Sequence, residues 1–139
     1  MEEDALMRIK IRAGGVVCEA GLLDNETARA VYDLLPIEGY NNVWGDEFYF
    51  EIPLYMPLDD SATADVEVGD IAYWPAGRSI AIFLGPTPLS KPGGKPVPAG
   101  LVNIIGKINF REKDGARYFL AGARDSNPII LEKEKVKAK

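Results

Sequence analysis

Glu47, Tyr49 and Glu51 occupy alternate positions in the segment from Val43 to Ile52. Alternate residues of an extended strand point to the same face, so these side chains converge, and neighbouring carboxylates suit general acid and base chemistry. A row of charged residues along a strand is more often a face in contact with water, and we predict a solvated face here. The opposite face of the segment carries apolar side chains: Trp44, Phe48, Phe50 and Ile52.

Several kinds of chemistry are excluded or disfavoured by the residues present. The chain has no histidine, which excludes Ser-His and Cys-His nucleophile pairs and removes the commonest zinc ligand. The one cysteine, Cys18, lies in an apolar run and is expected to be a buried structural thiol. Asp59, Asp60 and Asp65 could seed a cation site, but adjacent carboxylates in a loop are more typical of surface. We predict no catalytic residue, metal or cofactor.

The segment from Gly69 to Leu84 predicts a β-hairpin, because two short apolar runs flank the turn residues Pro75-Ala76-Gly77-Arg78. If Trp74 pairs with Ser79, the pleat divides the hairpin into two faces. One face is expected to be core: Ile71, Tyr73, Ile80, Ile82 and Leu84. The other sets large aromatics beside small residues: Ala72, Trp74, Ser79, Ala81 and Phe83. This second face predicts a shallow apolar surface open to a ligand.

Five prolines and four glycines occur among the sixteen residues from Gly85 to Gly100. Irregular segments of this length inside a compact domain usually pack over a surface or serve a function. Proline also lowers the entropy lost when such a loop becomes ordered. We expect this loop to rest against the aromatic strand and to shape the rim of a cleft.

The remaining segments predict strands and one helix. Alternation from Met7 to Arg12 and a return from Val16 to Leu22 predict a hairpin. Asp24 is expected to cap a helix that runs to Leu35. Further strands are expected at residues 101–110, with a bulge at Gly106, and at residues 117–121 after a turn at Lys113-Asp114-Gly115.

Many short strands with one helix predict a mainly β fold, specifically a closed β-barrel of about eight strands capped by that helix. The length of 139 residues fits one domain. We place the barrel domain at residues 1–128 and a charged C-terminal tail at residues 129–139, in which only Ile129, Ile130 and Leu131 are apolar enough to pack.

Charge and hydropathy narrow the expected partners and location. The net charge is −5 and the sequence has no basic stripe with interleaved aromatics, which disfavours nucleic acid as a partner. No apolar run is long enough to span a membrane, and the acidic start Met1-Glu2-Glu3-Asp4 is unlike a secretory signal, so a cytoplasmic location is expected. The absence of glutamine and the Glu/Lys-rich tail favour a thermophilic source.

Motifs along most of Met7 to Ala121 resemble the small bacterial and archaeal cyclophilin-like family, whose function is mostly unassigned. They include Trp44-Gly45, Tyr49-Phe50, Gly69-Asp70, Tyr73-Trp74-Pro75, Gly85, Thr87-Pro88, Asn103 and Gly106. The resemblance implies that the expected barrel is cyclophilin-like.

The segment Phe48 to Leu58 is similar to the catalytic strand of the prolyl isomerases of the same fold. In that frame Phe50 falls where the isomerases carry their catalytic arginine, and Leu58 falls near their glutamine. Neither side chain can donate a hydrogen bond to a proline amide as its resonance breaks. Arg78 is the nearest later arginine, and Ile82 or Phe83 matches the wall of the proline pocket.

We therefore predict a non-catalytic binding module that holds a small apolar ligand or a proline-containing peptide in a surface cleft. The expected ligand-binding residues are Phe50, Tyr55, Met56, Trp74, Arg78 and Phe83. Two alternatives remain: a peptidyl-prolyl isomerase with a displaced donor such as Arg78, and, from the resemblance alone, a subunit or relative of amide-processing enzymes that share the barrel. The sequence leaves the oligomeric state open.

Overall fold

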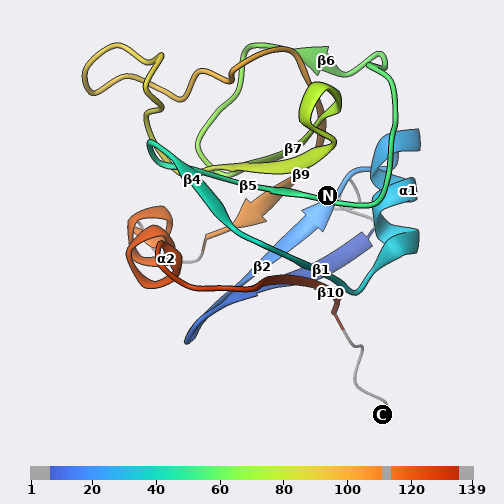
Figure 1. Cartoon of the computed structure of the whole chain (residues 1–139), viewed down its shortest axis with the longest axis horizontal. Coiled ribbons are helices and arrows are strands. Elements are labelled where there is room, and N and C mark those ends of the chain that lie inside the picture. The colour runs from blue at the N-terminus through green and yellow to red at the C-terminus, as the bar shows by residue number, and fades with distance from the viewer. Residues whose placement is uncertain (1–6, 111–113, 135–139) are drawn as a thin grey trace.

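Ten antiparallel strands pair into one sheet, with two helices packed against it (Figure 1). The computed structural model describes residues 7–110 and 114–134. The strands are β1 (Met7–Ala13), β2 (Val16–Leu22), β3 (Ile37–Gly39), β4 (Asn42–Trp44), β5 (Glu47–Glu51), β6 (Ala62–Thr63), β7 (Asp70–Trp74), β8 (Ser79–Phe83), β9 (Val102–Asn109) and β10 (Ile129–Lys133). The helices are α1 (Glu26–Leu34), α2 (Gly115–Ala123) and the 3-10 turn η2 (Pro75–Gly77).

The strand order is β3-β10-β1-β2-β9-β7-β8-β5-β4, with β6 attached to β9. This arrangement is the mainly β class expected from the sequence. The path ends at β3 and β4, which do not pair with each other within the described ranges, so the expected closed barrel is not confirmed. Among the described residues the sheet has ten strands rather than about eight, and there are two α-helices rather than one.

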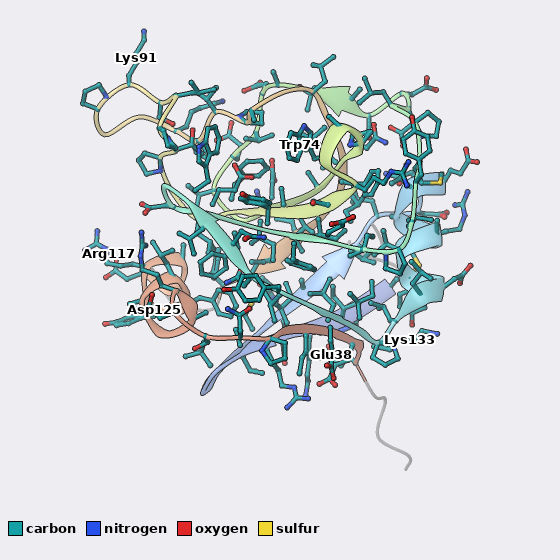
Figure 2. All side chains as sticks on the ribbon, in the orientation of Figure 1. Glu38, Trp74, Lys91, Arg117, Asp125 and Lys133 are labelled. Carbon is teal, nitrogen blue, oxygen red and sulfur yellow. The ribbon has the colours of Figure 1, made fainter. Side chains whose placement is uncertain are left out.

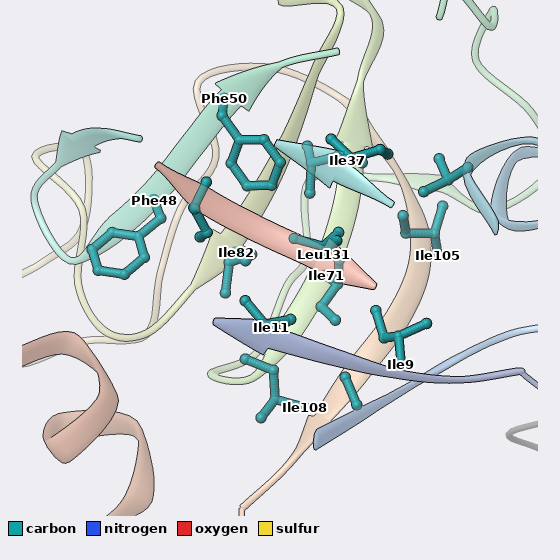
Figure 3. Close-up of a cluster of buried hydrophobic side chains, with 14 of the residues drawn as sticks. Ile9, Ile11, Ile37, Phe48, Phe50, Ile71, Ile82, Ile105, Ile108 and Leu131 are labelled. Atoms are coloured by element: carbon teal, nitrogen blue, oxygen red, sulfur yellow. The ribbon is translucent and has the colours of Figure 1, made fainter. Parts of the chain in front are cut away.

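The core lies on the concave side of the sheet, where every strand of the path from β10 to β5 contributes alternate apolar side chains. Ile9 and Ile11 of β1 are fully buried, as their alternation with charged residues predicts. Figure 3 shows Phe48 and Phe50 of β5 in the same cluster as Ile71, Ile82 and Leu131. Each fully buried side chain of this size contributes roughly 1.5–3 kcal/mol to folding.

Helix α1 covers one end of the sheet, next to β2 and β9 (Figure 1). Its N-cap is Asn25, one residue after the expected Asp24: Asn25 Oδ1 accepts the Ala28 N–H at 2.8 Å, and its Nδ2 donates to the Ile104 carbonyl at 3.1 Å. The second bond explains the shift, because asparagine caps the helix and ties it to β9, whereas Asp24 pairs with Arg29. Ala28 and Val31 of this helix are fully buried.

Residues 115–123 form helix α2, and the strand expected at residues 117–121 is wrong. Phe119 and Ala123 recur at the four-residue spacing of a helix and are buried, while Tyr118 is exposed. The segment also contains three alanines and one leucine, residue types that favour helix. Of the expected turn, Asp114 and Gly115 begin the helix, and Lys113 lies outside the described residues.

The segment expected as one strand from Val43 to Ile52 is instead a tight hairpin of β4 and β5 around Gly45 and Asp46. Gly45 has φ +62°, a left-handed conformation that favours glycine. The reversal places Trp44 directly opposite Glu47. Directly opposed residues of an antiparallel pair share a face, so the expected grouping of Trp44 with Phe48 and Phe50 is wrong.

Strand β10 lies between β1 and β3. Ile129 and Leu131 are fully buried, and Glu132 of β10 bonds to Arg12 of β1. Residues 129–133 therefore belong to the sheet, although the sequence groups them with the charged tail; residues 135–139 lie outside the described part of the chain.

The β-bulge expected at Gly106 is confirmed. Ile71 pairs with Gly106, but the next residue, Ala72, pairs with Ile104, so one residue of β9 is skipped. A Cβ at Gly106 would lie 2.5 Å from the Gly21 carbonyl oxygen and 2.9 Å from Leu22 Cδ2. At Gly106, β9 thus lies so close to β2 that a side chain at this position would overlap it.

Gly106→Ala is expected to lower the free energy of unfolding by about 1–3 kcal/mol, because the added methyl group overlaps backbone that cannot move aside. The matched control is Gly15→Ala, at a turn where a Cβ would meet nothing within 4 Å; its change should stay below about 0.5 kcal/mol. Urea unfolding of the two variants measures the difference, and equal stabilities would contradict the close approach of β9 to β2.

Candidate functional site

The outer face of strands β5, β8 and β7 carries a second set of buried side chains. Trp74 pairs with Ser79 as predicted, and the division of this hairpin into two faces is confirmed: Ile71, Tyr73, Ile80 and Ile82 lie in the main core, while Ala72, Ala81 and Phe83 form a second cluster with Val66, Val102 and Trp74. The sheet is therefore buried on both sides over these strands.

A pocket of about 210 Å³ opens on this outer face. Its lining residues are Trp44, Glu47, Tyr49, Trp74, Ala81, Phe83, Pro98, Ala99 and Val102. The pairing explains its shape: one row across the sheet is Trp44, Glu47 and Phe83, and in the next row Tyr49 lies opposite Ala81. The small Ala81 leaves a hollow between large side chains. Tyr49 and Trp74 meet edge to face, with ring centroids 6.4 Å apart.

The loop at residues 85–100 covers this face, and the prediction that it rests against the aromatic strand is confirmed by its contacts. At its start the Asp46 N–H donates to the Pro86 carbonyl at 2.9 Å. Further along, Pro98 and Ala99 line the pocket. Figure 2 shows Lys91 at the outer tip of the loop and Trp74 nearer the middle of the molecule.

Hydrogen bonds inside the loop and to its neighbours hold it in place. Thr87 Oγ1 donates to the Val97 carbonyl at 2.6 Å, and Ser90 Oγ donates to the Lys95 carbonyl at 2.7 Å. Lys95 Nζ bonds to the carboxylates of Asp65 and Glu67, and these bonds raise the pKa of the lysine. The loop is thus held by hydrogen bonds of its own, and it leaves a pocket over Glu47.

Glu47 lies in the pocket with its side chain almost removed from water. The residue is 6% exposed, and its Oε1 is buried without a hydrogen-bond partner in the described structure. Burial raises the pKa of Glu47 from 4.5 to about 8, because a carboxylate loses hydration that nothing replaces. The solvated face expected for this residue is wrong: the loop covers it.

The six residues expected to bind a ligand fall into three pairs. Trp74 and Phe83 line the pocket. Phe50 is fully buried in the main core, and Met56 packs against that core on the same side of the sheet. Tyr55 and Arg78 form an exposed pair, with the guanidinium 5.3 Å from the ring centroid.

Asp59 has a structural role within the described residues. Its carboxylate accepts the Thr27 hydroxyl at 2.6 Å and the N–H and hydroxyl of Ser61, while its own N–H donates to Asn103 Oδ1. Burial alone would raise the pKa of Asp59, but these hydrogen bonds outweigh it and lower the pKa. Among residues 7–110 and 114–134, no cluster of three or more acidic or cysteine residues could hold a metal.

Cys18 is partly buried. Burial, and to a smaller extent repulsion by the Glu19 carboxylate, raises the pKa of its thiol to about 12. A thiol with so high a pKa stays protonated and is a poor nucleophile.

The sequence predicts the aromatic face but not the burial of Glu47 within it, which raises the pKa of this carboxyl. The signal that could have found Glu47 is Gly45-Asp46, since this pair predicts a hairpin turn and thus a register that sets Trp44 beside Glu47. With the turn recognised, the carboxylate would be expected between aromatics, under the proline-rich loop.

Glu47→Gln is expected to change the pH dependence of stability. Between pH 4.5 and about 8 folded Glu47 holds a proton that the unfolded chain has released, so rising pH destabilises the wild-type protein by up to about 1.4 kcal/mol per pH unit. Glutamine cannot ionise, so the stability of the variant relative to wild type should increase across this window and level off above it.

Denaturant unfolding at a series of pH values measures this difference, with Glu51→Gln, an exposed carboxylate of the same strand face, as the control. The control should give a curve parallel to that of the wild-type protein. A parallel curve for Glu47→Gln as well would show that Glu47 is not held neutral by burial.

The described helices have nine residues each, and none has the length and hydrophobicity needed to cross a bilayer. No curated protein matches the chain. Among solved structures, the hypothetical protein AF2241 from Archaeoglobus fulgidus is 37% identical with a TM-score of 0.74, and the match covers 96% of this chain and all of that one.

A second solved structure shares the fold at low identity. McbB, in complex with tryptophan, has a TM-score of 0.66 and 14% identity, and the match covers 94% of this chain but 46% of McbB. The sequence model of the family described as cyclophilin-like matches residues 7–132. With that match over most of its length, the chain belongs to the cyclophilin-like family.

Proposed function

We propose that this protein is a small-molecule-binding module whose site is the pocket on the outer face of β5, β8 and β7. The observation that carries the proposal is the Glu47 carboxyl, which is buried among aromatic side chains with one oxygen unpartnered. Buried polar groups nearly always have hydrogen-bond partners. A group that lacks one inside an open pocket offers a hydrogen-bonding position to a bound molecule.

The size of the pocket favours a small ligand. Its volume of about 210 Å³ corresponds to roughly seven water molecules at ~30 Å³ each, below the range of about 300–1,000 Å³ typical of drug-sized ligands. A proline-containing peptide, the other ligand expected from the sequence, would extend well beyond such a pocket. An apolar body of one or two rings with one polar group suits both the aromatic walls and Glu47.

McbB, which shares the fold over 46% of its chain, is known in complex with tryptophan, and this is consistent with a ligand of this class. That likeness is one of fold, and McbB is about twice the length of this chain. It suggests indole and tryptophan as the first molecules to test here.

Prolyl isomerase activity is not part of the proposal. Phe50, at the position of the catalytic arginine in the isomerase frame, is fully buried in the main core. Arg78, the alternative donor, lies on the Tyr55 ring and does not line the pocket. Of these two residues only Arg78 can donate a hydrogen bond to a twisted amide, and it lies outside the proposed pocket.

Trp74→Ala is expected to weaken indole binding at least tenfold, because it removes one aromatic wall, an effect of at least about 1.4 kcal/mol. Its cost in folding stability should be smaller than the about 2–5 kcal/mol of Ile80→Ala, since Trp74 is only partly buried and Ile80 is fully buried. Calorimetric titration with indole and thermal unfolding measure the two effects.

The matched control is Tyr40→Ala, which removes an aromatic side chain that is 71% exposed and outside the pocket. It should leave indole binding unchanged. Indole binding that survives Trp74→Ala, or that falls equally in Tyr40→Ala, would contradict the assignment of the site.

We also expect no acceleration of proline isomerisation in a protease-coupled peptide assay. Loss of one donor from such a site costs on the order of 10²–10³ in rate. Acceleration comparable to that of a cyclophilin at equal concentration would overturn the non-catalytic assignment.

A further inference from the structure

Within the part of the chain that the structure describes, the pocket lining around Glu47 supplies no positive charge. Its neighbours across the pocket come from β4, β7, β8, β9 and the loop, as Trp44, Trp74, Phe83, Val102, Pro98 and Ala99. None of these side chains titrates, and Tyr49, on the same strand, is the one other ionisable residue of the lining. An ionised carboxylate in this position is costly unless a cation joins it.

Two charged residues of this region, Asp46 and Lys95, already have partners. Asp46 lies next to Glu47 and pairs with Arg124 at 3.7 Å. The Arg124 Nη2 also donates to the Gly45 carbonyl at 3.4 Å. On the loop, Lys95 bonds to Asp65 and Glu67, and Lys91 stands exposed at the outer tip (Figure 2).

The walls around Glu47 favour a cation. The lining contains two indoles, a phenol and a phenyl ring, those of Trp44, Trp74, Tyr49 and Phe83. Aromatic faces carry negative electrostatic potential and attract ammonium groups, with the largest effect at tryptophan. The net charge of −5 also favours the approach of a cation over that of an anion.

We propose that the ligand of this pocket is a small aromatic or apolar amine, whose ammonium group pairs with the Glu47 carboxylate while its ring occupies the space above Ala81. This proposal rests on the small-molecule-binding function and names the chemical class of the ligand. A single charged contact, formed inside an otherwise apolar pocket, would then distinguish amines from neutral molecules of the same shape.

The pairing implies that binding is coupled to proton release. Burial holds free Glu47 protonated at neutral pH, with a pKa of about 8. To bind an ammonium as a carboxylate, Glu47 must release its proton. Affinity for an amine should therefore rise by close to tenfold per unit below pH 7 and level off above about pH 8, until the amine itself loses its charge.

The experiment is calorimetric titration of the full chain with phenethylamine and with phenethyl alcohol, a neutral analogue of closely similar shape. The wild-type protein should bind the amine at least tenfold more tightly than the alcohol at pH 8. At pH 7, titrations in buffers of different ionisation enthalpy should show release of about one proton per amine bound and none for the alcohol.

Variants identify the group that is responsible. Glu47→Gln should bind both probes with similar affinity and lose the pH dependence and the proton release. Glu51→Gln, an exposed carboxylate of the same strand that does not line the pocket, should behave as the wild-type protein does. If Glu47→Gln does not fold, the proton release and pH profile of the wild-type protein still decide the question.

Two outcomes would overturn the proposal in different ways. If the alcohol binds as tightly as the amine, or if amine binding releases no proton, the ligand class is wrong while the binding function stands. If neither probe binds to the wild-type protein, the ligand class is wrong, and if indole does not bind either, the small-molecule-binding function falls with it.

Discussion

Strands β5, β8, β7 and β9 bury side chains on both of their faces. Each face must therefore be covered by another part of the chain, and the arrangement of the molecule follows from this requirement. The inner face packs against β1, β2 and β10 in the main core. The outer face holds Ala72, Ala81, Phe83 and Val102, which would expose a continuous apolar surface without the loop at residues 85–100. The pleat enforces this division, because every second residue must point outward. The proline-rich loop, its anchors at Asp46 and Lys95, and the pocket beneath it all follow from the second face.

The cover over the outer face is incomplete at one place. Small side chains at Ala81 and Ala99 leave a hollow, and Glu47 lies in its wall where an apolar residue would complete the cluster. A buried carboxyl with an unpartnered oxygen lowers stability by on the order of 1–3 kcal/mol. Proteins commonly carry such local instability where they bind or react with other molecules. The same residue thus weakens the free fold and provides the polar contact through which a ligand would be selected.

The sequence predicts local structure well here, but it predicts less well which residues are buried by segments distant in the chain. The alternation at Ile9 and Ile11 and the Trp74–Ser79 register depend on neighbours in the chain, and both are confirmed. The sequence predicts Glu47 in water because only the residue pattern of its own strand enters that prediction. A loop some fifty residues further along the chain buries it instead. Strand β10 was missed for a similar reason: its partner is β1, and Arg12 meets Glu132 across 120 residues. For α2, a short apolar run suits either helix or strand, and packing against β2 decides for helix.

The central claim is that the fold itself, without any ligand, holds Glu47 neutral beneath the loop. Heteronuclear NMR titration of the Glu47 side-chain carboxyl in the free protein tests this most directly, since it follows the ionisation of one group. The account predicts a titration midpoint near pH 8. A midpoint for Glu47 near the ordinary value of 4.5 would show that the carboxyl is hydrated in solution, and would contradict the account.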